Sequence, residues 1–368
     1  MFTRTHLDIF IYFIKLGLFG FGGPFAVMGS MQKDLIEKRK WLSLEQFSQA
    51  LSFIKALPGP VAAQIAVYVG YKRGGRIGGL IAGVALIFPS FCLMLLLGYF
   101  YDDIKQTKFA NSFFEGMQLA AIGVILSSVV DLAKPHLRKP RFWFFAIASG
   151  LAFIQNRAHE PIYIVGCGIL SILFEKGVEA SKKGTIFEVG SLGILLVLGW
   201  VSFKSGAFLF GSGLAIIPAL AHDVVTKHHW LTHQQFLDAI AFGQITPGPV
   251  LISITFIGFK AFGFIGAFAA TFFIFLPSFL NMLTWFPSAL KKFQKTKYAQ
   301  VFLTGAIASV VGCVSAVVPS LIPEATRMTL DVMVISLSFI LIRFFGTKIG
   351  AWAVIPICGV FYILASKF

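Results

Sequence analysis

Long runs of apolar residues, separated by short polar segments, dominate the hydrophobic pattern of this chain. A helix needs about 20 apolar residues to cross the hydrocarbon core of a membrane, and several of the runs reach that length. The shorter runs can span if they are lengthened by flanking residues. The pattern therefore predicts an all-α polytopic membrane protein, with apolar helices at 77–101, 109–133, 142–155, 162–174, 192–203, 264–286, 301–322, 330–344 and 352–365.

Two Pro-Gly-Pro-Val segments, at 58–61 and 247–250, interrupt this pattern. The apolar segments that flank the first one, 46–57 and 61–71, are too short to cross the membrane at about 1.5 Å per residue. Proline disfavours helical geometry in the residue before it, glycine permits a sharp turn, and proline suits the first position of a helix. We therefore expect re-entrant half-helices that meet near mid-membrane; a kink in one packed span is the alternative.

The two Pro-Gly-Pro-Val segments belong to an internal repeat. Residues 15–61 and 204–250 align without a gap and share 18 identities, which include lysine, tryptophan and glutamine positions. Membrane composition alone does not align such residues, so we infer a duplication. We assign residues 1–175 to the first repeat, 176–189 to a connector and 190–368 to the second repeat.

The basic residues indicate how the two repeats are oriented. They gather at 33–40, 72–76, 134–141 and 291–297, whereas the equivalent loops of the other repeat hold few. Loops rich in lysine and arginine stay on the cytoplasmic side, so equivalent loops of the two repeats lie on opposite sides. The sequence therefore predicts two inverted-topology repeats with broken or re-entrant half-helices.

Composition narrows the class further. Only 13% of the residues are charged and 57% are hydrophobic, whereas about a quarter of a typical soluble domain is charged. The net charge of +15 follows from the loop lysines and arginines, and we expect no nucleic-acid partner. We expect a multi-pass protein that is embedded in the lipid bilayer of a bacterial inner membrane.

A broken helix inside a membrane offers a candidate site for an anion. The first backbone N–H groups of a helix lack partners and carry the positive end of the helix dipole. Lysine inside a span is costly and suggests function, although snorkelling to the interface is an alternative. The candidate substrate-binding residues are Lys15, Gly22, Gly23, Lys55, Pro58, Gly59, Pro60, Val61, Ala62, Gln64, Lys204, Gly211, Gln244, Pro247, Gly248, Pro249 and Val250.

We also expect the second tip to present the N–H groups of Leu251 and Ile252. His229 and His233 have a spacing that one helix face could offer to zinc, but we expect a solvated loop instead. Asp131 and Arg343 lie near span ends, where structural roles are expected. No nucleotide-binding motif occurs, and we expect no cofactor and no metal.

The motifs together resemble the chromate ion transporter family. The resemblance covers both halves and rests on segments 15–17, 21–24, 37–43, 57–60 and 89–91, and on 230–232 and 246–250. It implies an inner-membrane carrier that exports chromate and confers resistance to it, and we expect transport by alternating access around the paired helix breaks. Sulfate or another oxyanion, or a channel of the same fold, is the alternative, and a proton is one candidate for the coupling ion.

Two other classes of function need different residues. A membrane-embedded enzyme requires a nucleophile, a base or a metal set within the spans, and the spans hold few carboxylates and no central histidine. We therefore expect no enzymatic activity. A channel or a scaffold without transport differs from a carrier in flux, which the sequence does not determine.

Overall fold

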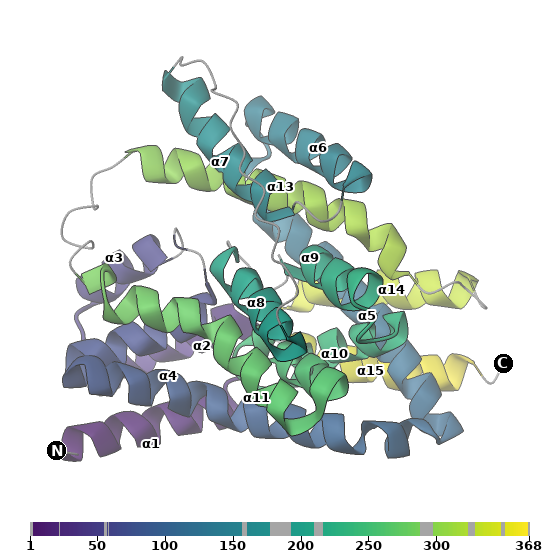
Figure 1. Cartoon of the computed structure of the whole chain (residues 1–368), viewed down its shortest axis with the longest axis horizontal. Helices are drawn as coiled ribbons and strands as arrows, with labels where there is room; N and C mark the ends of the chain where they lie inside the picture. Colours follow the sequence, from purple (N-terminus) through teal and green to yellow (C-terminus); the bar gives the residue numbers. More distant parts are fainter. Residues whose placement is uncertain are drawn as a thin grey trace.

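The computed structural model describes residues 3–21, 23–54, 57, 59–156, 160–176, 193–209, 216–287, 297–322, 328–346 and 350–366, which are helical apart from turns and short connections (Figure 1). Four helical segments within these ranges are long and apolar enough to cross a membrane. They are Val61–Lys105, Lys108–His136, Val250–Leu283 and Thr304–Leu321. The chain is a multi-pass helical membrane protein, as its hydrophobic pattern predicts.

Each repeat supplies the same series of helices. The first repeat contains α1 (Arg4–Phe19), α2 (Gly23–Gln32), α3 (Leu44–Ile54), α4 (Val61–Lys105), α5 (Lys108–Ala133), α6 (Pro140–Gln155) and α7 (Glu160–Lys176). The second contains α8 (Ile194–Ala207), α9 (Ile217–Ala221), α10 (His233–Ile245), α11 (Ser253–Leu283), α13 (Lys297–Leu321), α14 (Met328–Phe345) and α15 (Ala351–Ala365). The helix breaks before α4 and before the η6–α11 segment (η6, Val250–Ile252) fall at the two Pro-Gly-Pro segments, where the sequence predicts them.

Helices α4 and α11 each fold back on themselves. Gly75 in α4 and Gly263 in α11 have φ of 64° and 61°, a conformation that suits glycine, and the helical geometry is interrupted there. The two arms of α4 then pack so closely that the backbone of Gly78 leaves no room for a Cβ on Gly70. The first arm is therefore one side of a hairpin that re-enters the protein, and the second arm is a full-length span.

The second arms of α4 and α11 run antiparallel to each other. Gly79, near the start of the span in α4, lies against Leu283 at the end of α11. At the other end of the pair, the rings of Tyr99 and Phe264 are 6.2 Å apart. Equivalent spans of the two repeats thus point in opposite directions, which confirms the inverted topology.

The duplicated tryptophans fix the entry to each re-entrant hairpin. Short π-helical turns, η1 (Lys33–Lys38) and η5 (His222–Lys227), lead into Lys40 and His229, which both adopt positive φ. The next residue packs on the turn inside the long helix of its repeat. The Trp41 ring lies 5.5 Å from the Arg73 guanidinium, and the Trp230 ring lies 5.5 Å from the ring of Phe262. The two equivalent tryptophans thus pack on different partners: Trp41 on a cation, on the side predicted to be cytoplasmic, and Trp230 on a phenyl ring, on the other side.

The C-terminal helices of the two repeats are exchanged. Helix α5 of the first repeat packs on α14 and α15 of the second, and α13 of the second repeat packs on α6 and α7 of the first (Figure 1). One continuous apolar core joins buried residues of both repeats, such as Ile122 on α5 and Cys358 on α15. The repeats are therefore intertwined rather than placed side by side.

Candidate functional site

The glycine of each Pro-Gly-Pro segment is hydrogen-bonded to the other repeat. The backbone N–H of Gly59 donates to the carbonyl oxygen of Leu209 at 2.8 Å, and that of Gly248 donates to the carbonyl of Gly20 at 3.0 Å. Gly20 and Leu209 are equivalent positions at the ends of α1 and α8. Each Pro-Gly-Pro turn is thus joined to the end of the first helix of the opposite repeat.

Only glycine fits at the two turns. Gly59 and Gly248 have φ of 125° and 96°, a region that L side chains rarely adopt. A Cβ at Gly248 would also collide with the Ser90 hydroxyl, which donates to the carbonyl of Pro247 at 2.6 Å. A Cβ at Gly59 would collide with the equivalent hydroxyl of Ser278. The Pro-Gly-Pro turns are therefore seated against the second arms of α4 and α11.

The N-terminal tip of α4 carries backbone donors without acceptors. The N–H groups of Val61, Ala62 and Ala63 have no intrahelical acceptor, because the first helical bond joins the N–H of Gln64 to the carbonyl of Pro60. We find no other acceptor for these groups in the described part of the chain. All three residues are buried, so the tip combines free donors with the positive end of a helix.

The equivalent tip in the second repeat is wound differently. Val250–Ile252 form a 3₁₀ turn, and the N–H of Ile252 donates to the carbonyl of Pro249 at 3.0 Å. The expectation of a free N–H at Ile252 is therefore wrong. The tighter winding satisfies this donor and leaves those of Val250 and Leu251 as the counterparts of the α4 tip.

Two buried glutamines lie next to the Pro-Gly-Pro turns. Gln64 is fully buried, and its amide nitrogen lies against Gly59. Gln244, one turn before Pro247, is only 7% exposed, and its Nε2 has no hydrogen-bond partner among the described residues. The hydroxyl of Ser278 is likewise buried without a partner. A buried amide without a partner carries a free-energy cost, which a ligand oxygen at this point would remove.

The two equivalent lysines lie in different surroundings. Lys204 forms an ion pair with the buried Asp223 at 2.5 Å, whereas Lys15 is exposed on α1. Asp34, the counterpart of Asp223, is paired instead with Lys38 at 2.7 Å. Neither lysine contacts the described residues of the Pro-Gly-Pro turns through an ion pair or a hydrogen bond.

The other candidate residues divide into two groups. Gly22, Lys55, Pro58 and Gly211 lie outside the described residues, and Gly23 begins α2. Pro60, Pro247, Pro249 and Val250 are buried within the turns described above.

The histidines do not share one helix face, because His229 lies in the turn before α10 and His233 begins that helix. Asp131 and Arg343 pair with each other at 2.6 Å and link α5 to α14.

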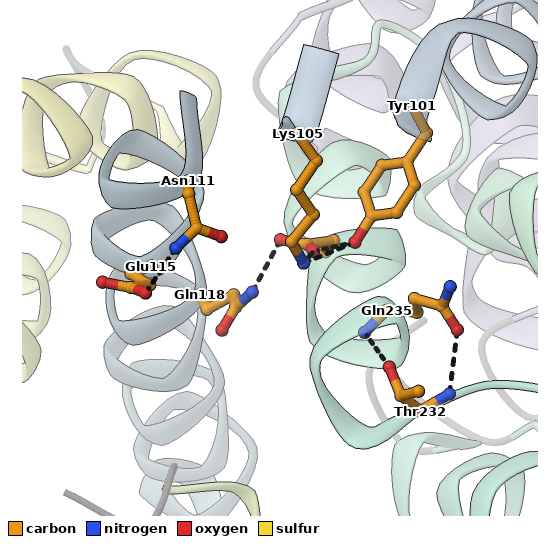
Figure 2. Close-up of polar contacts among 8 residues, drawn as sticks. Tyr101, Lys105, Asn111, Glu115, Gln118, Thr232 and Gln235 are labelled. Carbon is orange, nitrogen blue, oxygen red and sulfur yellow. Dashed lines mark hydrogen bonds and ion pairs between the residues drawn. The ribbon is translucent and has the colours of Figure 1, made fainter. Parts of the chain in front are cut away.

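A buried carboxylate, absent from the sequence-based candidates, joins the repeats on the face predicted to be extracellular. Asp238 on α10 is 1% exposed and accepts hydrogen bonds from Tyr101 at 2.5 Å and from Gln118 at 2.8 Å. Lys105, at the end of α4, pairs with the same carboxylate at 2.9 Å (Figure 2). We call these four residues the α10 latch. The sequence signal that could have identified Asp238 is an acidic residue inside an otherwise apolar helix.

The duplicated glutamines that follow the tryptophans have a local structural role. Gln235 and Thr232 exchange hydrogen bonds of 2.9 and 3.2 Å in a capping box at the start of α10 (Figure 2). Gln46 and Ser43 form the same motif before α3. The boxes satisfy two backbone donors at each re-entrant helix, which explains why both repeats carry this pair.

Many membrane transport proteins are built from inverted repeats with re-entrant half-helices and buried helix ends. The architecture of this chain places it in that class. The profile of the family described as "Chromate transporter" matches this chain twice, at residues 7–172 and 196–363. The chain belongs to the chromate transporter family. The two matches coincide with the two structural repeats.

Relatives cover nearly the whole chain. A protein of Cupriavidus metallidurans named "Chromate transport protein" is 34% identical over 90% of this chain and 85% of its own length. A "Probable chromate transport protein" of Synechococcus elongatus is 34% identical over 83% of this chain and 82% of its own. A "Chromate transport protein" of Pseudomonas aeruginosa is 30% identical over 85% and 80%. No solved structure gives a significant match.

Proposed function

We propose that this protein is a secondary transporter that exports chromate, or a related tetrahedral oxyanion, across a bacterial inner membrane. The cargo is inferred from the names of the relatives, which match the chain across both repeats. The chemistry of the Pro-Gly-Pro turns agrees with it, because an oxyanion accepts many hydrogen bonds and carries negative charge.

The buried donors beside the two Pro-Gly-Pro turns are the observation that carries the proposal, and we refer to this region as the junction. The tip of α4 supplies the N–H groups of Val61, Ala62 and Ala63, and Gln244 adds a buried amide without a partner. Helix N-termini bind anions through such donors and through the dipole. The donors that the described residues supply are neutral, and neutral donors hold a dianion without trapping it as a buried ion pair would.

An asymmetry between the repeats supports alternating access. Helix α10 packs on α5 and α15 and is tied by the α10 latch, whereas its counterpart α3 makes no comparable contact with α13 or α7 in the described ranges. Loop charges place α3 on the cytoplasmic side and α10 on the outer side. We infer a state closed toward the outside, and exchange of the two arrangements would move the site between the two sides.

Uptake into everted membrane vesicles tests the proposal. Vesicles that contain the protein should accumulate labelled chromate, excess sulfate should compete if tetrahedral shape is the main criterion, and a protonophore should abolish accumulation if a proton is the coupling ion. Vesicles without the protein are the control. Equilibrating flux unaffected by any imposed gradient would instead indicate a channel, and no flux of any oxyanion would refute the proposal.

A further inference from the structure

A cavity with a basic rim lies away from the Pro-Gly-Pro turns, between α6, α7 and α13. Its volume is about 540 Å³. Arg138, Lys139 and Arg141 line it on one side, at the start of α6. Ser171 on α7 and Thr304 on α13 add hydroxyl groups. The described lining residues contribute three positive charges and no negative one.

The cavity has the features of a headgroup site rather than of a deep ion path. Its floor is formed by the buried rings of Phe142 and Phe145. Trp143, beside it, donates its indole N–H to the carbonyl of Leu137 at 3.1 Å and is 38% exposed. Tryptophan at a helix end marks the level of lipid headgroups, so the three cations lie where a lipid phosphate lies.

An apolar track continues from the cavity along α6. The outer face of the helix exposes a row of large side chains at helical spacing, each more than half exposed: Phe144, Ile147, Leu151 and Ile154. Within a membrane such a face contacts acyl chains. A basic pocket at one end of this face suits a molecule with an anionic head and apolar tails.

We propose that this cavity binds the phosphate headgroup of an anionic phospholipid in the cytoplasmic leaflet, and we call it the α6 lipid site. Arg138, Lys139 and Arg141 hold the phosphate, and the uncapped N-terminus of α6 adds its dipole. Since α6 and α7 pack on α13 of the other repeat, a bound lipid also ties the two repeats together.

Native mass spectrometry of the purified full chain tests this assignment. The protein should retain phosphatidylglycerol in preference to phosphatidylcholine. The triple variant Arg138→Gln, Lys139→Gln, Arg141→Gln should lose on the order of a hundredfold in affinity, because each cation near an anionic lipid contributes roughly a fivefold factor. The matched control is Lys72→Gln, Arg73→Gln, Arg76→Gln, which removes the same charge elsewhere and should retain the lipid.

A further variant and a competitor keep the test decisive. Thr304→Leu narrows the cavity without changing charge and should also weaken binding of phosphatidylglycerol, even if the triple variant fails to insert. Equal retention of both lipids, or equal loss in both triple variants, would overturn the proposal. Displacement of the lipid by millimolar inorganic phosphate or chromate would also overturn it, because the cavity would then be a site for free oxyanions.

Discussion

At the scale of residues, the junction and the latch use polar groups in opposite ways. The Asp238 carboxylate is fully engaged by Tyr101, Gln118 and Lys105, whereas the Gln244 amide nitrogen is buried with no partner. A satisfied buried network stabilises one arrangement of the repeats. An unsatisfied buried amide costs stability unless a water or a ligand binds there, and the proposed oxyanion would supply that partner.

Asp238→Asn should destabilise the protein by about 2–4 kcal/mol, because it leaves Lys105 without its buried counter-ion, although part of Lys105 reaches solvent. Adding Lys105→Met should recover part of the loss, since a neutral pair costs less than a broken ion pair. Thermal unfolding in detergent measures both effects. If the double variant is no more stable than Asp238→Asn alone, the ion pair is not the main function of the network.

Gln244→Leu should leave the protein as stable as the wild type or raise its stability by about 1 kcal/mol, because it removes a buried amide that lacks a partner. Ser127→Ala is the matched control: Ser127 on α5 is also buried without a partner, but it lies outside the junction. Thermal unfolding in the absence of oxyanion measures both. A marked loss of stability in Gln244→Leu would show that the amide has a structural role.

At the scale of elements, the glycine turns determine where helices end. Gly59 and Gly248 let the chain reverse and donate to the opposite repeat, and the following proline is the N-cap of the next helical segment. Gly75 and Gly263 let one continuous helical sequence fold into a hairpin. The re-entrant geometry thus depends on four backbone positions rather than on side-chain chemistry.

Gly248→Ala should destabilise the protein by at least about 1–2 kcal/mol, because alanine resists positive φ and its Cβ would meet the Ser90 hydroxyl. Gly166→Ala on α7 is the control, since it lies in regular helix with open space around it, and it should be neutral or slightly stabilising. Equal effects of the two substitutions on thermal unfolding would contradict the role assigned to the turn.

The sequence predicted these elements better than it predicted their contacts. Repeated Pro-Gly-Pro, Trp41 with Trp230, and alternating loop charges were sufficient for the broken helices and their inversion. The pairing of Lys204 with Asp223 was not predictable, because Lys15 and Asp34 have the same spacing and do not pair. Asp238 was missed because its partners lie 120 or more residues away in sequence, on helices of the other repeat.

At the scale of the whole molecule, exchange of the C-terminal helices makes each repeat dependent on the other. Because α5 lies against α14 and α15, residues 1–176 alone would expose a large apolar face of α5. The first repeat expressed alone should therefore be degraded, and co-expression with residues 193–368 should restore it. Immunoblotting of membranes measures this. Stable accumulation of the first repeat alone would argue against intertwined repeats.

Alternating access requires α10 to separate from α5. The rings of Phe114 and Phe242 meet at this contact, 5.3 Å apart. In a background without the four native cysteines, a disulfide between Phe114→Cys and Phe242→Cys should abolish chromate flux, and reduction should restore it. The single-cysteine variants under the same oxidation are the controls. Full flux through the cross-linked protein would contradict the proposed opening of the outer side.

The central claim is that an oxyanion binds at the junction of the two Pro-Gly-Pro turns, and equilibrium binding of chromate to the purified protein tests it most directly. The wild type should bind chromate saturably, at one site per chain. Gln244→Leu should weaken binding at least tenfold, since a hydrogen bond to a charged group contributes about 1.5–3 kcal/mol, while Ser127→Ala should bind as the wild type does. Unchanged chromate affinity in a folded Gln244→Leu protein would contradict the account.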